Sequence, residues 1–346
     1  MKNIQGKKIT ILGAVRSGLG AAKLAKKLGA IPFVSDMGDE QKLLEAKEIL
    51  YNEGIEFEFG KHSDKVFDCD ILITSPGVPS NSGVIKEAEK RGIKIISEIE
   101  FASWYCDAEI IAITGTNGKT TTTSLMHYAI NMCNSISKVG GNIGTAFSLF
   151  SDTTTKDEFA VLEISSFQLD YIDTFKPKYA VIINITPDHL DRYEHSFDKY
   201  ANSKFLITKN QNENDYLIIN KDDEKIKEFE DINKKVNKIY FSIKEKLNNG
   251  TYFNNNKIYF AKDGKEEEIC NITDLNLKGD HNLYNSLAVV SVLKLLNKEN
   301  EKIKEVLSTF PGVEHRLEFV REINGVKYIN DSKATNVDAV WYALRS

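Results

Sequence analysis

A short apolar run that leads into a glycine-rich turn and then a helix is the feature that most constrains this sequence. It occurs at residues 8–12, before a helix predicted over residues 21–28, and again at residues 109–114, before a helix over residues 120–132. Both runs are short and rich in isoleucine, and the second is apolar from Ile110 to Ile113. Strands of that kind between helices are typical of a parallel sheet with both faces covered. The predicted fold class is therefore α/β.

Further elements of the same type follow along the chain. Strands are predicted at residues 31–35, 70–74, 94–96, 159–163, 179–184, 257–260, 317–321 and 326–330, and helices at residues 84–90 and 282–296.

A length of 346 residues suggests two domains and a remainder, at roughly 150 residues per domain. We place the boundaries near 97 and 312, which defines domains of residues 1–97, 98–312 and 313–346.

Charge and composition exclude several classes of protein. The chain has 45 Lys and Arg against 50 Asp and Glu, a net charge of −5, whereas nucleic-acid binding usually needs a basic face. No apolar run approaches the roughly 20 residues of a membrane-spanning helix, and the N-terminus does not resemble a signal peptide. The four cysteines form no Cys-x-x-Cys pair, so they fit neither a zinc site nor a disulfide framework. We expect a cytoplasmic protein with no nucleic-acid or membrane partner.

The second glycine-rich turn has the composition of a phosphate-binding loop. It consists of Gly115, Thr116, Asn117, Gly118, Lys119, Thr120 and Thr121. Glycines let backbone N–H groups approach an anion, the helix N-terminus favours negative charge, and a lysine followed by a hydroxyl suits phosphates and Mg²⁺. The general pattern begins with a glycine where Ile113 stands, so this is a shorter variant. The alternative is a turn in which glycine and threonine only cap the helix.

The first glycine-rich turn, residues 13–20, does not fit a dinucleotide. That fingerprint needs a glycine at position 15 so that a pyrophosphate can approach the backbone, and the chain has Val15. The sequence therefore argues against NAD. A packing turn without a ligand is the alternative to a nucleotide pocket.

Several further stretches carry a resemblance to a known family. They are GGNIG at residues 140–144, EISSFQL at 163–169, NITPDHLDRY at 184–193, GDHNLYN at 279–285, His315 with Arg316, and NDSKATN at 330–336. Together with the phosphate turn, these motifs resemble the Mur ligase superfamily in order and spacing, over essentially the whole chain. The SSFQL stretch resembles the MurD branch, which joins D-glutamate to UDP-N-acetylmuramoyl-L-alanine.

The resemblance implies a fold and a reaction. The fold would be a Rossmann-like UDP-binding domain, a central P-loop-type ATPase α/β domain and the start of a third α/β domain. The reaction would be ATP-dependent amide ligation through an acyl phosphate, in cytoplasmic peptidoglycan precursor synthesis, by a monomer. Two Mg²⁺ ions and a carbamylated lysine are implied as cofactors. A sister ligase that adds another amino acid, folate polyglutamation included, and a nucleotide-binding fragment without ligase activity are the alternatives.

The resemblance also implies roles for individual residues. Metal ligands would be Thr120, Glu163, His189 and carbamylated Lys204. Contacts to the UDP substrate would come from Arg16, Ser17, Asp36, Gly77, Asn142, Ser165 and His189. Adenosine would be held by Asn282, Asn285, Arg316 and Asp331, and the γ-phosphate and amino-acid side would face Lys333 and Thr335. Lys119, Asn142, His189 and Lys204 are the expected catalytic residues.

Taken without the resemblance, three of these residues have simpler interpretations. Glu163 could be a helix N-cap, His189 a structural loop histidine, and Lys204 a solvated lysine on a helix. The resemblance favours metal binding for all three.

The last 34 residues carry an expectation of their own. They hold a hairpin and the start of a helix whose apolar positions are Val337, Val340, Trp341 and Leu344. A unit of that size is too small for an independent core. The family has a third domain here that binds much of the D-glutamate. We therefore expect a final helix that is exposed, frayed or covered by another molecule, and ligation of D-glutamate that is feeble or does not occur.

Overall fold

The computed structural model describes residues 2–316, 318–334 and 340. Contacts divide the chain into two compact units, which differ from the domains expected from sequence. The first unit contains Met1–Ile110, Lys138–Pro177 and His189–Asn210. The second contains Ile111–Ser137, Lys178–Asp188 and Gln211–Ser346. The boundaries near 97 and 312 stay a prediction.

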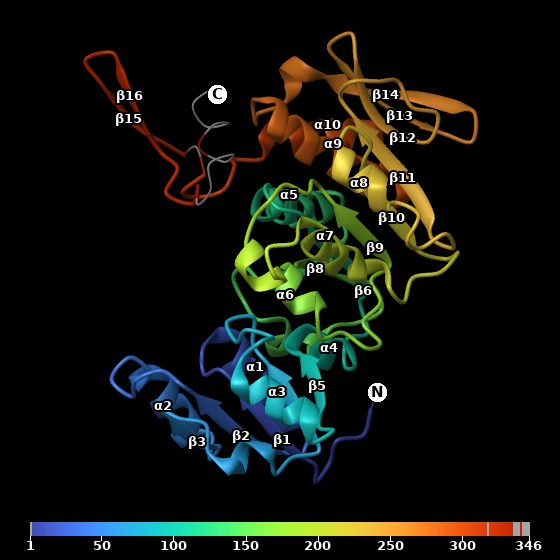
Figure 1. The fold of residues 1–346 in the computed structure, drawn as a ribbon. Helices are drawn as coiled ribbons and strands as arrows, with labels where there is room; N and C mark the ends of the chain where they lie inside the picture. The colour runs from blue at the N-terminus through green and yellow to red at the C-terminus, as the bar shows by residue number, and fades with distance from the viewer. Residues whose placement is uncertain (1, 317, 335–339, 341–346) are drawn as a thin grey trace. The chain divides into compact units, whose positions relative to one another are not determined.

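The first unit begins with a parallel sheet, drawn in blue to cyan in Figure 1. Its strands lie in the order β3-β2-β1-β4-β5, and every pair is parallel. The strands are β1 Lys8–Leu12, β2 Ile31–Asp36, β3 Glu56–Phe59, β4 Ile71–Thr74 and β5 Lys94–Ser97. The helices between them are α1 Arg16–Lys27, α2 Leu44–Asn52, α3 Gly83–Lys90 and, after β5, α4 Glu98–Ser103, with a 3₁₀ turn η1 at Asp64–Phe67.

The apolar strands are buried on both faces, as the continuous apolar runs predicted. Ile9 and Ile11 of β1 pack in one core with residues of α1. The side chain of Leu12, at the end of β1, lies on the opposite face of the sheet. It packs in a second core with Leu72 of β4 and Ile85 of α3. Strand order reverses between β1 and β4, and the carboxyl ends at such a switch point are where ligands bind in open α/β sheets.

The rest of the first unit comes from later in the chain. Its regular elements are β7 Ile136–Gly141, β8 Glu158–Glu163, α6 Ser166–Leu169 and α7 Phe197–Phe205, with 3₁₀ turns η2 Phe147–Leu149, η3 Ser151–Thr153, η4 Leu190–Tyr193 and η5 Leu206–Thr208. Helix α6 begins with a capping box, in which Ser165 and Gln168 bond reciprocally. These elements carry most of the expected metal ligands.

The second unit is built on a mixed sheet. Its strands lie in the order β14-β13-β12-β11-β10-β9-β6, parallel from β6 to β12 and antiparallel beyond. They are β6 Glu109–Thr114, β9 Tyr179–Ile182, β10 Tyr216–Asn220, β11 Asn237–Ser242, β12 Gly250–Asn254, β13 Lys257–Lys262 and β14 Lys265–Asn271. The helices are α5 Lys119–Met132, α8 Glu224–Phe229, α9 Asp280–Leu295 and α10 Asn300–Thr309, with the turn η6 at Ile272–Asp274. Helix α9 is almost wholly buried and packs on α5 and the sheet.

A C-terminal hairpin follows, made of β15 Glu318–Ile323 and β16 Val326–Asn330. This confirms the hairpin and its two strands expected there. The turn between the strands is Asn324–Gly325, and both residues have positive φ. Apolar side chains of the hairpin, Phe319 among them, are exposed, and Val340 is exposed as well. The expected helix positions Val337, Trp341 and Leu344 lie outside the described residues.

One prediction about an element boundary was wrong. Helix α1 begins at Arg16, five residues before the predicted start at Ala21. Gly18 and Gly20, which suggested a loop, are instead buried in the helix. A Cβ on Gly18 would lie 1.8 Å from the carbonyl oxygen of Gly13, so close helix–turn packing is the reason for that glycine. Arg16 and Ser17 are therefore the first residues of a helix. The backbone N–H groups of a first helical turn have no hydrogen-bond acceptor within the helix.

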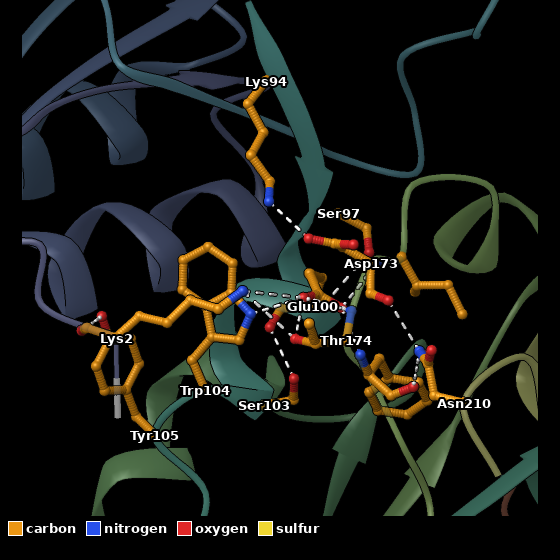
Figure 2. Close-up of polar contacts among 12 residues, drawn as sticks. Lys2, Lys94, Ser97, Glu100, Ser103, Trp104, Tyr105, Asp173, Thr174 and Asn210 are labelled. Carbon is orange, nitrogen blue, oxygen red and sulfur yellow. Dashed lines mark hydrogen bonds and ion pairs between the residues drawn. The ribbon is translucent and has the colours of Figure 1, made fainter.

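The loop before β9 is held by a buried carboxylate, shown in Figure 2. Glu100 of α4 has a side chain with 0% exposure. Its oxygens accept hydrogen bonds from Trp104 Nε1 at 2.6 Å, from Thr174 Oγ1 at 2.6 Å, and from the backbone N–H groups of residues 173–175. Burial raises the pKa of Glu100, but the hydrogen bonds from Thr174 and Trp104 outweigh it, and the net pKa is lowered. The carboxylate thus acts as an anionic anchor for the loop.

Candidate functional site

The phosphate turn lies between β6 and α5, as the sequence predicted. Gly118 is the N-cap residue of α5 and has φ +84°, in the left-handed region. A Cβ at this position would lie 2.5 Å from Asn285 Oδ1, so a side chain is excluded by strain and by space. The turn therefore presents backbone N–H groups at a helix N-terminus, which is an arrangement suited to phosphate.

A side chain that sequence reasoning did not single out holds this turn. Asn184 follows β9, and its Oδ1 accepts the N–H groups of Thr116 at 3.1 Å and Asn117 at 2.9 Å. Its Nδ2 donates to the carbonyl of Asn117 at 3.0 Å. The hydroxyl of Thr116 also pairs with the backbone of Thr186. These contacts fix the turn from the neighbouring strand before any ligand binds.

Lys119 lies folded over the turn. Its Nζ donates to the carbonyl oxygens of Gly115 at 3.0 Å and Thr116 at 2.7 Å. The ammonium is thereby held at the N-terminus of α5, where a phosphate would bind. A lysine so placed adds a full positive charge to the partial charge of the helix terminus.

The residues expected to hold adenosine group around the start of α9. Asn282 and Asn285 are both buried, and Asn285 Nδ2 donates to Asn282 Oδ1 at 3.3 Å. Burial lowers the pKa of His281, while Asp331 raises it and Arg316 lowers it through their charges. The charges of Arg316 and Asp331 thus act on His281, in the first turn of α9. Lys333 is exposed, and Thr335 lies outside the described residues.

Glu163 and Asn142 form a connected pair in the first unit. Asn142 Nδ2 donates to Glu163 Oε1 at 2.7 Å, and the backbone N–H of Asn142 donates to the Glu163 carbonyl at 2.8 Å. This close approach requires Gly141, at φ +95°, because a Cβ there would lie 2.3 Å from the same carbonyl. Glu163 is 2% exposed and ends β8. It is not the N-cap of α6, a position that Ser165 occupies.

The expected UDP pocket lies at the carboxyl ends of the first sheet. Asp36 Oδ2 accepts the N–H of Ala14 at 2.6 Å, and its Oδ1 accepts the N–H of Gly38 at 2.6 Å. The carboxylate therefore joins the turns that follow β1 and β2. Arg16 Nη1 donates to the carbonyl of Gly144 at 3.2 Å, which brings it onto the loop that carries Asn142. Ser17 lies beside Arg16 in the first turn of α1.

His189 stands at the start of η4 with φ +50°, a left-handed conformation that is uncommon for residues other than glycine. Its ring meets the ring of Phe167 edge-on, with centroids 5.4 Å apart. Ser165, expected to contact the substrate, donates its hydroxyl to Gln168 Oε1 at 3.2 Å and helps to cap α6.

Lys204 differs from the solvated lysine that its sequence context alone suggested. It lies on α7 and is 1% exposed, with Nζ 4.6 Å from the ring centre of Tyr200. The neighbouring Ser203 hydroxyl pairs with Asp170 and Tyr193. Burial raises the pKa of Asp170, although these hydroxyls, Arg192 and Lys204 lower it. The helix faces inward here because Tyr200, Ala201 and Phe205 are also buried.

The donor set suits a hard cation. Mg²⁺ prefers oxygen ligands, and Glu163 offers a buried carboxylate that Asn142 orients. A lysine ammonium is not a metal ligand, but a carbamate on Lys204 would supply carboxylate-like oxygens. Within residues 2–316, 318–334 and 340, no group of three or more His, Cys, Asp or Glu side chains could hold a metal by itself. A metal at Glu163 would thus depend on further ligands, such as a carbamate or substrate oxygens.

Comparison with known proteins decides the family. The Mur ligase middle domain family matches residues 113–293, which include the phosphate turn, Glu163, His189 and Lys204. The MurD N-terminal domain family matches residues 8–84. A UDP-N-acetylmuramoylalanine--D-glutamate ligase of Christiangramia forsetii is 45% identical over 343 residues, covering 99% of this chain and 76% of that protein. This chain belongs to the MurD family of Mur ligases. The resemblance inferred from its motifs is confirmed.

Other relatives of this Mur ligase agree. The enzyme of the same name from Salinibacter ruber is 42% identical over 345 residues, covering 97% of this chain and 75% of that protein. Among solved structures, UDP-N-acetylmuramate-alanine ligase MurC from Thermotoga maritima has a TM-score of 0.60 at 22% identity, covering 98% of this chain and 77% of that one. MurF ligase from Thermotoga maritima in complex with ADP has a TM-score of 0.57 at 16% identity, covering 100% and 75%. These likenesses confirm the α/β fold class.

Among the described residues, no helix has the length and apolar character to span a bilayer.

Proposed function

We propose that this chain is an ATP-dependent ligase that joins D-glutamate to UDP-N-acetylmuramoyl-L-alanine. The observation that carries the proposal is the 45% identity over 99% of the chain to a D-glutamate ligase, together with the matched MurD N-terminal domain. The product is a precursor of peptidoglycan, so the protein would work in the cytoplasm in cell-wall synthesis. It would act as a monomer.

The reaction has two steps that these residues suit. The γ-phosphoryl group of ATP moves to the terminal carboxylate of UDP-N-acetylmuramoyl-L-alanine, which yields an acyl phosphate and ADP. The amine of D-glutamate then attacks the acyl carbon, loses a proton and expels phosphate, which leaves an amide. The charge on the transferring phosphoryl group needs fixed positive partners, and Lys119 with the N–H groups of the turn would supply them.

Two metal positions are part of the proposal. Thr120 and Glu163 would hold one Mg²⁺, and His189 and carbamylated Lys204 would hold the other. Bound Mg²⁺ would neutralise negative charge on the phosphoryl oxygens. Asn142, which already orients Glu163, would contact the substrate near the reacting carboxylate. Arg16, Ser17, Asp36, Gly77 and Ser165 would line the UDP side.

The remaining expected residues would serve ATP and the incoming amino acid. Asn282, Asn285, Arg316 and Asp331 would hold adenosine, in keeping with their grouping near the start of α9. Lys333 and Thr335 would face the γ-phosphate and the amino-acid side. Holding three substrates together would remove much of the entropic barrier to ligation.

A release assay for ADP tests the proposal against a sister ligase. The protein is supplied with ATP, Mg²⁺ and UDP-N-acetylmuramoyl-L-alanine, and then with D-glutamate, L-glutamate, L-lysine or meso-diaminopimelate in turn. We expect ADP release with D-glutamate to exceed release with the other three. Faster release with any of those three would assign the chain to another ligase reaction.

Carbamylation of Lys204 leads to a separate prediction. Replacing Lys204 with alanine should abolish ligation, because the oxygen ligands of the second metal would be lost. Acetate or formate should restore part of the rate by supplying a carboxylate in the same space. The protein equilibrated with ¹³C-bicarbonate should show a carbamate resonance that the K204A variant lacks.

The matched control lies on the same helix. Lys199 of α7 is exposed and pairs with Glu194, so K199A should keep the wild-type rate and the carbamate resonance. Full activity of K204A, or a wild-type spectrum without the resonance, would refute the carbamylation.

A further inference from the structure

Arg192 connects two segments of the first unit that the proposed reaction needs together. Its Nη1 donates to the carbonyl oxygen of Pro76 at 2.8 Å, and its Nη2 lies 3.4 Å from the carbonyl of Gly77. Its guanidinium carbon lies 4.3 Å from the ring centre of Phe167. A planar guanidinium can bind a turn through its fork of donors and stack on a ring at the same time, which a lysine ammonium cannot do.

The ring of Phe167 lies between Arg192 and His189 and contacts both side chains. Phe167 meets His189 edge-on at 5.4 Å and lies parallel to Tyr193 at 5.9 Å. Arg192 and Tyr193 both belong to η4, the turn that His189 opens. The guanidinium lies over the face of the phenyl ring, and the phenyl ring contacts the imidazole edge-on, so the three groups form one connected series of contacts.

The turn that carries His189 needs outside support. His189, Glu194 and His195 all have positive φ, between +50° and +57°, which is costly for residues with a side chain. Such conformations persist only where surrounding contacts determine them. The hydroxyl of Tyr193 pairs with Asp170 at 3.2 Å on one side of the turn, and the Arg192 contacts provide support on another.

The other end of the connection lies at the carboxyl end of β4. Pro76 and Gly77 follow this strand at the switch point of the sheet, where the UDP substrate is proposed to bind. A small pocket beside the contact is lined by Ser75, Phe167 and Arg192, among others.

We propose that Arg192 is a positioning residue, which sets the Pro76–Gly77 turn and His189 relative to one another. This inference rests on the proposed function, because the two segments are those assigned to the UDP substrate and to a metal. Arg192 would not contact phosphate itself, since its donors bind backbone carbonyls and its face covers a ring. Its effect on ligation would therefore pass through the two segments that it joins.

The test compares R192K and R192A with a matched control. Arg91 also stacks on a phenyl ring, that of Phe67 at 4.1 Å, and pairs with Glu87, but it ends α3 away from these turns. For R192K we expect KM for the UDP substrate to rise and kcat to fall, each by about 10-fold or more, with KM for ATP unchanged. Guanidinium ion at millimolar concentration should partly rescue R192A, whereas ammonium should not. R91K should match the wild type.

Hydrogen exchange provides a readout that does not need activity. In R192K the amides of residues 75–79 and 189–195 should both exchange faster than in the wild type, while R91K leaves them unchanged. Wild-type kinetics together with wild-type exchange in R192K would overturn the proposal. A second outcome would also overturn it. If R192K lost affinity for the UDP substrate alone, with a weaker salt dependence of that affinity and unchanged hydrogen exchange, Arg192 would be a direct phosphate ligand. A wild type that ligates no D-glutamate but shows the paired exchange effect would refute the proposed function and leave the role of Arg192 standing.

Discussion

Replacing Lys119 with alanine is expected to lower ATP turnover by about 10²-fold or more while the fold remains intact. The ammonium of Lys119 bonds two carbonyls of the phosphate turn and would neutralise charge on the transferred phosphoryl group. The loss of one such charge-assisted contact in the transition state corresponds to about 3 kcal/mol. Steady-state release of ADP measures the effect.

The fold should survive because other residues hold the turn. Asn184 binds it through three hydrogen bonds, and Gly118 caps α5 without a side chain. The thermal unfolding curve of K119A should therefore stay close to that of the wild type. Lys86, an exposed lysine of α3, provides the control, and K86A should keep full turnover. Turnover by K119A within a few-fold of the wild type would contradict the role given to the phosphate turn.

Replacing Glu100 with glutamine is expected to destabilise the first unit by about 3 kcal/mol or more, because removing one partner of a buried charged network is costly. The carboxylate accepts bonds from Trp104, Thr174 and the N–H of Phe175, all between 2.6 and 2.9 Å. The NH₂ group of a glutamine would point its two N–H donors at N–H and O–H groups that are themselves donors, so hydrogen bonds would be lost. Urea denaturation, followed by tryptophan fluorescence, measures the loss.

The effect should depend on pH in a defined direction. The pKa of Glu100 is lowered from its ordinary value of 4.5, so its charge stabilises the folded state. That contribution is complete above the unfolded pKa and is lost as pH falls through the lower folded pKa. The difference between wild type and E100Q should shrink below about pH 4.5. Glu48, exposed on α2, is the control, and E48Q should change stability by about 0.5 kcal/mol or less. An E100Q variant as stable as E48Q at pH 7 would contradict the anchor.

Sequence patterns predicted the buried strands best. Strands such as Glu109–Thr114 and Val326–Asn330 were predicted to the residue, because continuous apolar runs or a clear Asn-Gly turn mark them. Strand β3 was missed because its Glu-Phe-Glu-Phe sequence is short, polar at alternate positions and only half-buried at the sheet edge. Helix α4 was missed although Ser97, three residues before Glu100, is an N-cap signal. In the structure that glutamate turns away to hold the loop at residues 173–175.

Parts of the candidate site that consist of neighbouring residues in the sequence were predicted. Contacts between residues far apart in the sequence were missed. The phosphate turn is readable because its glycines and lysine are contiguous. Asn184 contacts Asn117 across 67 positions, and Arg192 contacts Pro76 across 116, so neither pairing leaves a local pattern. The burial of Lys204 likewise follows from how α7 packs, which its own sequence does not reveal.

Ligation of ¹⁴C-labelled D-glutamate tests the central claim most directly. The protein is incubated with ATP, Mg²⁺, UDP-N-acetylmuramoyl-L-alanine and the labelled amino acid, and the nucleotide-linked product is separated and counted. The account predicts labelled UDP-N-acetylmuramoyl-L-alanyl-D-glutamate that forms only when ATP is present and does not form with K119A. Label entering the product from L-glutamate, L-lysine or meso-diaminopimelate in place of D-glutamate, or no ATP-dependent labelling at all, would contradict it.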